Sequence, residues 1–119
     1  MATILLVEDN DDLRGCMRLR LEADNHRVVE AADGHDAIQL WSDHNPDLII
    51  TDFRMPRMNG LEVIQAVAPH QPALPILLMS GGMEEQLRLC ILHHFPSVRY
   101  LPKDVLSDQL RQVVSELLA

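Results

Sequence analysis

The sequence predicts an α/β fold, in which a doubly wound parallel sheet of five strands has helices on both faces. Short apolar runs of strand length alternate five times with longer stretches of helical periodicity, which is typical of consecutive β-α units. Three of the runs are uninterrupted, as expected for strands buried on both faces, and two contain charged residues. Placing the two charged runs at the edges gives the strand order 2-1-3-4-5, and ligands of such a sheet bind outside the carboxyl ends of its strands.

The five strand candidates are rich in aliphatic residues. The first, third and fourth are the uninterrupted runs, whereas Arg27 and Glu30 lie in the second and Arg99 lies in the fifth. The predicted ranges, in order, are Thr3–Val7, Arg27–Ala31, Asp47–Thr51, Leu74–Met79 and Val98–Leu101.

Helical periodicity fills the intervals and the end of the chain. In the last helix Leu106, Leu110 and Val113 recur at helical spacing, and Asp33-Gly34 breaks the chain before the second helix. The predicted ranges are Asp11–Asp24, Gly34–His44, Leu61–Ala68, Met83–His94 and Leu106–Leu118. A chain of 119 residues, 47% of them hydrophobic, can bury one core, so we expect a single domain over residues 1–119.

Composition argues against several classes of partner. The net charge of -8 disfavours a nucleic acid or an anionic membrane as the main partner. No apolar run approaches the ~20 residues of a membrane span, and the start MATILLVEDN has no basic leader. Cys16 and Cys90 lie inside helical patterns, so we expect two buried thiols in a reducing compartment, by default the cytoplasm.

Four of the five predicted strands are followed by side chains that could take part in chemistry. Glu8 and Asp9 follow the first strand, Asp52 the third, Ser80 the fourth and Lys103 the fifth. Singly, each has an ordinary explanation, because acids favour helix starts, aspartates form turns and lone lysines are mostly solvated. Parallel strands end at one edge, however, so these groups should converge, and their joint placement favours a functional site.

The three acids of this set must either take up protons or hold a cation. Oxygen ligands, two or three of them anionic, suit Mg²⁺. Asp52 could then act as a nucleophile toward phosphorus and form an aspartyl phosphate. Mg²⁺ and Lys103 would neutralise the equatorial oxygens during transfer, and Ser80 could donate a hydrogen bond to a phosphoryl oxygen.

Four motifs carry a more specific signal. They are LLVEDN with Glu8-Asp9, LIITDFRMPRMNG with Asp52, ILLMSGG with Ser80, and YLPK with Lys103. Together they resemble the receiver domains of bacterial two-component response regulators, over essentially the whole chain. The resemblance implies a (βα)5 flavodoxin-like fold, in which Asp52 accepts a phosphoryl group from a histidine kinase or a histidine phosphotransfer protein.

The same resemblance implies a metal site. Asp9, Asp52 and the backbone carbonyl of Arg54 would hold Mg²⁺, with Glu8 assisting through water. It also implies a signalling phosphoacceptor rather than an enzyme, one that phosphorylates itself with Mg²⁺ and slowly dephosphorylates itself.

Ser80 and Tyr100 resemble the switch pair of the family, in which the hydroxyl moves toward the phosphate and the aromatic ring turns inward. The family's output surface is formed by the fourth helix, the fifth strand and the fifth helix. The resemblance therefore implies an output partner on this surface, or a homodimer that forms on phosphorylation.

The predicted fourth helix has apolar residues on two sides. One face carries Met83, Leu87, Cys90 and Ile91, whereas Leu89 and Leu92 project from nearly the opposite side. Since one face must pack on the sheet, the other is expected to leave apolar surface for a partner.

Two positions depart from the family pattern. The family usually has a cis-bonded proline after the lysine, but here Asp104 follows Lys103. A cis bond costs ~2.5–4 kcal/mol before a residue other than proline, against ~0.5–1 kcal/mol before proline, so we expect a trans bond. Asp104 is expected to cap or begin the last helix rather than bind metal. After Ser80, where alanine is common, Gly81-Gly82 makes the loop more permissive.

Other interpretations stay open. A phosphatase or phosphotransferase with an aspartate nucleophile would share the chemistry, but it needs a cap or substrate pocket. A docking module that works without phosphorylation would not need all five rim groups. The chain could also be a stand-alone regulator or the receiver of a hybrid histidine kinase. A histidine metal site is disfavoured, because the adjacent His93 and His94 point apart on a helix.

Overall fold

Five parallel strands form one sheet in the computed structural model, which describes residues 1–119. Their order is β2-β1-β3-β4-β5, as predicted, and each neighbouring pair is parallel. The strands are β1 (Thr3–Val7), β2 (Arg27–Ala31), β3 (Leu48–Asp52), β4 (Ile76–Ser80) and β5 (Val98–Pro102).

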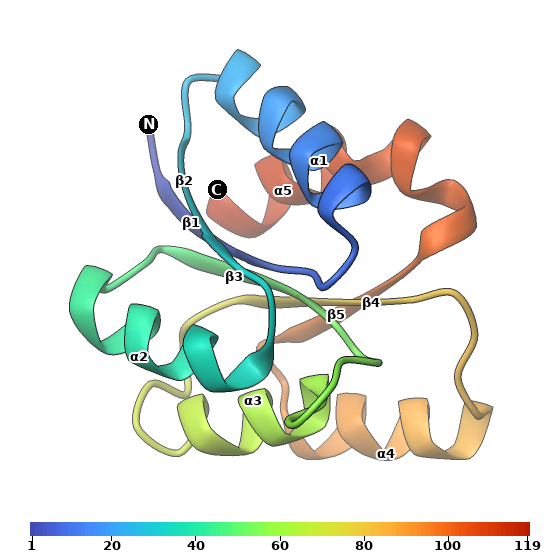
Figure 1. Cartoon of the computed structure of the whole chain (residues 1–119). Coiled ribbons are helices and arrows are strands. Elements are labelled where there is room, and N and C mark those ends of the chain that lie inside the picture. Colours follow the sequence, from blue (N-terminus) through green and yellow to red (C-terminus); the bar gives the residue numbers. More distant parts are fainter.

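The helices cover the sheet in two layers, with α1 (Asp11–Ala23) and α5 (Leu106–Leu118) on one face (Figure 1). The other face is covered by α2 (Gly34–His44), α3 (Gly60–Val67) and α4 (Glu85–His94). Each layer encloses its own apolar cluster, because successive strand residues point to opposite faces of the sheet. None of the helices combines the length and the apolar character needed to cross a membrane.

The element bounds agree with the predicted ranges to within one or two residues, and two of the differences bear on the site. β3 runs one residue further than expected and ends at Asp52, because the Phe53 N–H still donates to the Met79 carbonyl at 2.8 Å. β4 begins at Ile76, after Pro75, and ends at Ser80. Asp52 and Ser80 therefore belong to the sheet rather than to the loops that follow it.

The burial of the two thiols is the clearest point on which the sequence prediction fails. Cys16 and Cys90 are both exposed, so the prediction of buried thiols is wrong. Each precedes a buried residue of its helix, Met17 or Ile91. Successive helical residues are rotated by about 100°, so burial of one turns its neighbour toward solvent.

Helix α4 also differs from expectation. Leu92 packs on the core on the same side as Ile91, and Leu89 is left 52% exposed. The apolar outer face therefore contains one leucine rather than two. The helix starts at Glu85 with no side-chain cap and fully buries only Ile91, whereas α3 has a capping box and buries four residues.

Gly60 sits where the chain leaves no room for a side chain. A Cβ there would lie 2.6 Å from the Asp52 carbonyl oxygen and 2.9 Å from Phe53 Cα. Gly60→Ala should therefore lower the free energy of unfolding by about 1–3 kcal/mol, as overpacking does.

Gly15 is the matched control, because it lies within α1 and no atom approaches its Cβ position within 4 Å. Gly15→Ala should raise the free energy of unfolding by about 0.5–1 kcal/mol through helix propensity. Urea denaturation measures both values, and a Gly60→Ala variant as stable as the wild type would contradict the tight packing.

Candidate functional site

The residues predicted to converge are largely brought together at the carboxyl ends of the strands. Lys103, directly after β5, places its Nζ 2.7 Å from Glu8 Oε1 and 2.9 Å from Asp52 Oδ2. Carboxylate oxygens of Glu8, Asp9 and Asp52 all lie within 4.8 Å of one another. One ammonium therefore pairs with two of the three clustered carboxylates, which come from the ends of two strands.

Burial is uneven among these groups and perturbs their proton affinities. The side chain of Glu8 is 0% exposed and that of Asp52 is 6% exposed, whereas Asp9 is open to solvent. Burial raises the pKa of Glu8, although the Lys103 ammonium and the Asn10 N–H oppose the rise. Burial alone would lower the pKa of Lys103, but its ion pairs with Glu8 and Asp52 outweigh the effect of burial and the pKa is raised.

The acid cluster has the chemistry of a cation site. Glu8 Oε1 is buried and accepts no well-directed hydrogen bond, although Lys103 Nζ lies close enough to form an ion pair. Asp9 contacts no cationic side chain within ion-pair distance, so Lys103, which pairs with Glu8 and Asp52, is the only cationic side chain paired with a carboxylate of this cluster. Hard oxygen donors with one buried, poorly satisfied lone pair fit Mg²⁺.

A second acidic cluster, made of Asp33, His35 and Asp36, does not fit a metal in the same way. Asp33 Oδ1 accepts the Asp36 N–H at 2.8 Å, and Asp33 Oδ2 pairs with the Arg57 guanidinium. Both oxygens of the buried acid therefore already have partners within the protein.

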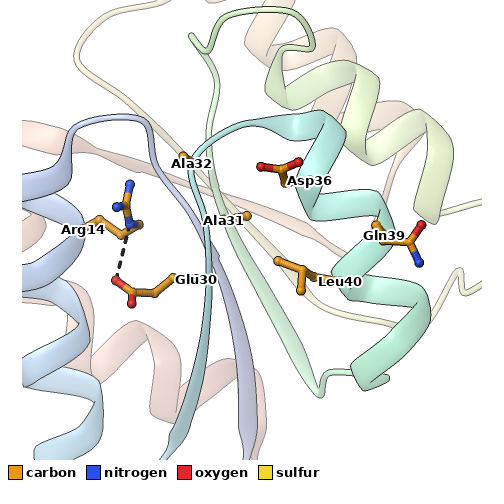
Figure 2. Close-up of a pocket in the computed structure, with 7 residues that line it drawn as sticks. All are labelled: Arg14, Glu30, Ala31, Ala32, Asp36, Gln39 and Leu40. Atoms are coloured by element: carbon orange, nitrogen blue, oxygen red, sulfur yellow. Dashed lines mark hydrogen bonds and ion pairs between the residues drawn. The ribbon is translucent and has the colours of Figure 1, made fainter.

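A hollow of about 480 Å³ lies near this second cluster, over the edge strand β2 and between α1 and α2. Figure 2 shows the Arg14–Glu30 ion pair, 3.4 Å long, on one side of it and Asp36 and Gln39 on the other. None of the rim acids lines the hollow. The chemically distinctive site is thus the open acidic rim rather than this hollow.

The predicted switch residues lie on β4, which neighbours β3, and on β5, the edge strand beyond β4. Ser80 ends β4 and is buried, and its Oγ accepts the Gly82 N–H at 3.1 Å. Tyr100, in β5, is half-buried against the core beneath α4, and the Arg88 guanidinium lies 5.3 Å from its ring centroid.

The segment after Lys103 confirms one expectation and corrects part of another. The chain has no cis peptide bond, so Lys103-Asp104 is trans as predicted. Asp104 is not the N-cap of α5, because that helix starts at Leu106 without a side-chain cap. Asp104 instead lies exposed in a 3-10 helix, Lys103–Val105, whose backbone continues directly into α5.

Sequence reasoning missed several residues that surround the site. Asn10 caps α1 through its side chain and donates its N–H to Glu8 Oε2 at 3.1 Å. Arg14 donates to the Glu8 carbonyl oxygen at 2.7 Å. An asparagine directly before a helix that begins with two aspartates is a recognisable capping signal, but no pattern links Arg14 to Glu8.

Comparisons with known proteins agree with this geometry. Residues 4–115 match the model of the response regulator receiver domain. The chain is 38% identical over 85 residues to the transcriptional regulatory protein AfsQ1 of Streptomyces coelicolor, covering 71% of this chain and 37% of that protein. It is 37% identical over 119 residues to the sensor histidine kinase TmoS of Ectopseudomonas mendocina, covering 98% of this chain and 12% of that kinase.

Among solved structures, the non-phosphorylated HemR receiver domain of Leptospira biflexa superposes with a TM-score of 0.91 at 26% identity. The match covers 100% of this chain and 95% of that domain. By contrast, the chain spans little more than a third of AfsQ1 and about an eighth of TmoS. The matched model and the shared fold show that this chain belongs to the response regulator receiver domain family.

Proposed function

We propose that the chain is a phosphorylation-dependent switch of a two-component phosphorelay, with Asp52 as the phosphoacceptor. The observation that carries the proposal is the placement of Asp52, which is buried at the end of a central strand, bonded to Lys103 and flanked by Glu8 and Asp9. The donor would be the phosphohistidine of a sensor histidine kinase or of a histidine phosphotransfer protein.

In the proposed step Asp52 attacks phosphorus through Oδ1, since Lys103 engages Oδ2. The new O–P bond forms as the N–P bond to the donor imidazole breaks, and the electron pair stays on the imidazole nitrogen. Lys103 is held within reach of the incoming phosphoryl oxygens by its bonds to two acids. Its charge then offsets the charge that Asp52 acquires.

The residues proposed to hold Mg²⁺ are Asp9, Asp52 and the backbone carbonyl of Arg54, with Glu8 assisting. When bound, the ion neutralises charge on the phosphoryl oxygens and orients them for in-line transfer. The buried and poorly satisfied oxygen of Glu8 supports this donor set.

We further propose that Ser80 and Tyr100 connect the site to a face made by α4, β5 and α5. Ser80, whose Oγ accepts the Gly82 N–H, would donate its hydroxyl proton to a phosphoryl oxygen. Tyr100, over whose ring the Arg88 guanidinium of α4 lies, would then turn inward. An output partner or a second copy of the chain would bind this face.

The domain would act on no substrate other than itself: it would phosphorylate itself with Mg²⁺ and slowly dephosphorylate itself. The likeness to both a transcriptional regulatory protein and a sensor histidine kinase is compatible with a regulator or a hybrid-kinase receiver. A docking role that needs no phosphate is the less favoured alternative, since it does not explain the charged rim. Two free thiols support a reducing compartment such as the cytoplasm.

The first prediction concerns the acceptor. With Mg²⁺ and acetyl phosphate, the protein should acquire one labile phosphate, which mass spectrometry of the intact chain detects. Asp52→Asn should abolish it, because an amide oxygen is a poor nucleophile, and the exposed Asp12→Asn should not. An equal yield in Asp52→Asn would refute the assignment.

The second prediction concerns pH. Because burial raises the pKa of Glu8, this carboxyl gains its proton at a higher pH than an ordinary glutamate. Protonation removes a charge that favours Mg²⁺, so Mg²⁺ affinity should fall as pH decreases through this raised pKa. Glu8→Gln should bind Mg²⁺ more weakly at neutral pH and lose this part of the dependence. Calorimetric titrations at several pH values test it, and parallel profiles in both proteins would contradict it.

The third prediction concerns the switch. Beryllofluoride, a phosphate mimic, should shift the amide NMR signals of residues 83–100 in the wild type. Ser80→Ala should keep Mg²⁺ bound yet suppress these distant shifts, and the exposed Ser42→Ala should behave as wild type. Equal shifts in Ser80→Ala would place the coupling elsewhere.

A further inference from the structure

The loop that follows Asp52, residues 53–59, is closed at its base and fixed at its tip. At the base, the Gly60 N–H donates to the Phe53 carbonyl at 2.8 Å. At the tip, Arg57 has a φ of 66° and pairs with Asp33, at the start of α2. We call residues 53–59 the acceptor loop.

The tip contact joins the largely exposed side chain of Arg57 to an acid that is itself nearly buried. Arg57 holds a left-handed backbone, which is unfavourable for a residue with a Cβ and needs compensation from its surroundings. Asp33 is 7% exposed and caps α2 through its other oxygen. The Asp36 N–H and Arg57 together keep the pKa of Asp33 low, so this acid stays charged.

Backbone packing supports the same contact. A Cβ on Gly34 would lie 2.6 Å from the Met58 carbonyl oxygen, so the loop tip rests directly on the first turn of α2. On its opposite side the loop is tied more weakly, by Arg54 to the Gly82 carbonyl oxygen at 3.4 Å. Arg57 is therefore the stronger of two side-chain tethers that flank the segment.

The acceptor loop contains the Arg54 carbonyl that we propose as a Mg²⁺ ligand. A side-chain ligand can adjust through its rotamers, but a backbone carbonyl is aimed only by the conformation of its own segment. An anchored loop has already lost the conformational freedom that metal binding would otherwise remove.

We propose that Arg57 is a positioning residue, which through Asp33 holds the acceptor loop in the conformation that binds Mg²⁺. This inference rests on the function proposed above. In this proposal the start of α2 supports the phosphoacceptor site, although it lies outside the α4–β5–α5 face.

Two variants separate the ion pair from the fold. Asp33→Asn keeps a good N-cap but removes the charge that Arg57 binds. Arg57→Gly removes the guanidinium while it relieves the left-handed backbone. Each variant should bind Mg²⁺ about tenfold more weakly, which is the lower end of the loss typical for residues that support metal ligands. Titration with Mg²⁺, followed by backbone amide NMR signals, measures the affinity.

The double variant tests whether the two residues act as one unit. It should bind Mg²⁺ no more weakly than either single variant, and Arg57→Lys should recover part of the loss. Asp36→Asn is the matched control, since it removes an exposed charge from the same helix end and should leave the affinity unchanged. Urea midpoints without Mg²⁺ should stay close to wild type in Arg57→Gly, whereas a merely structural role would lower them and leave the affinity intact.

The outcomes discriminate between the two proposals. Unchanged Mg²⁺ affinity in Asp33→Asn and Arg57→Gly, with normal binding by the wild type, would overturn this inference alone. A wild type that binds no Mg²⁺ would overturn the proposed metal site and this inference with it. Losses that simply add in the double variant would show that Arg57 does not act through Asp33.

Discussion

One ammonium group balances two buried carboxylates at the edge of this sheet, and the arrangement of the site depends on that contact. A buried carboxylate without compensation is strongly unfavourable, and here Lys103 lies within 3 Å of both Glu8 and Asp52. Because the three residues end or follow β1, β3 and β5, the contact ties together strands that are not all neighbours. The long lysine side chain spans β4, which lies between β3 and β5.

The carboxylates at this edge are less completely paired than other acids of the molecule. Asp33 satisfies both of its oxygens, and Asp24 binds Arg111 through both of its own. Glu8, the most buried acid of all, keeps an oxygen without a well-directed donor. Asp33 and Asp24 are thus fully paired, whereas only one ammonium serves the three rim acids, so the rim carries the excess of negative charge that attracts a divalent cation.

Topology was the most predictable part of the molecule. Three uninterrupted apolar runs and two charged ones were enough to order the strands, and parallel strands bring Asp52 and Lys103 to one edge although 51 residues separate them. The facing of Cys90 and Leu92 was not predictable, because α4 carries apolar residues around much of its circumference and its pattern does not fix its rotation. The Arg57–Asp33 contact could not be predicted from the sequence either. It joins two polar residues 24 positions apart, and neither belongs to a periodic pattern.

The helices differ in how well caps and burial hold them in place, and this difference affects how a change at the site could reach a partner. Helix α4 starts without a side-chain cap and buries a single residue completely, so little free energy holds its last and first turns in place. Elements of this kind open locally far more often than the whole domain unfolds. We therefore expect α4 to open locally more often than the better anchored α3, and a partner that binds an opened conformation would draw on a population that already exists.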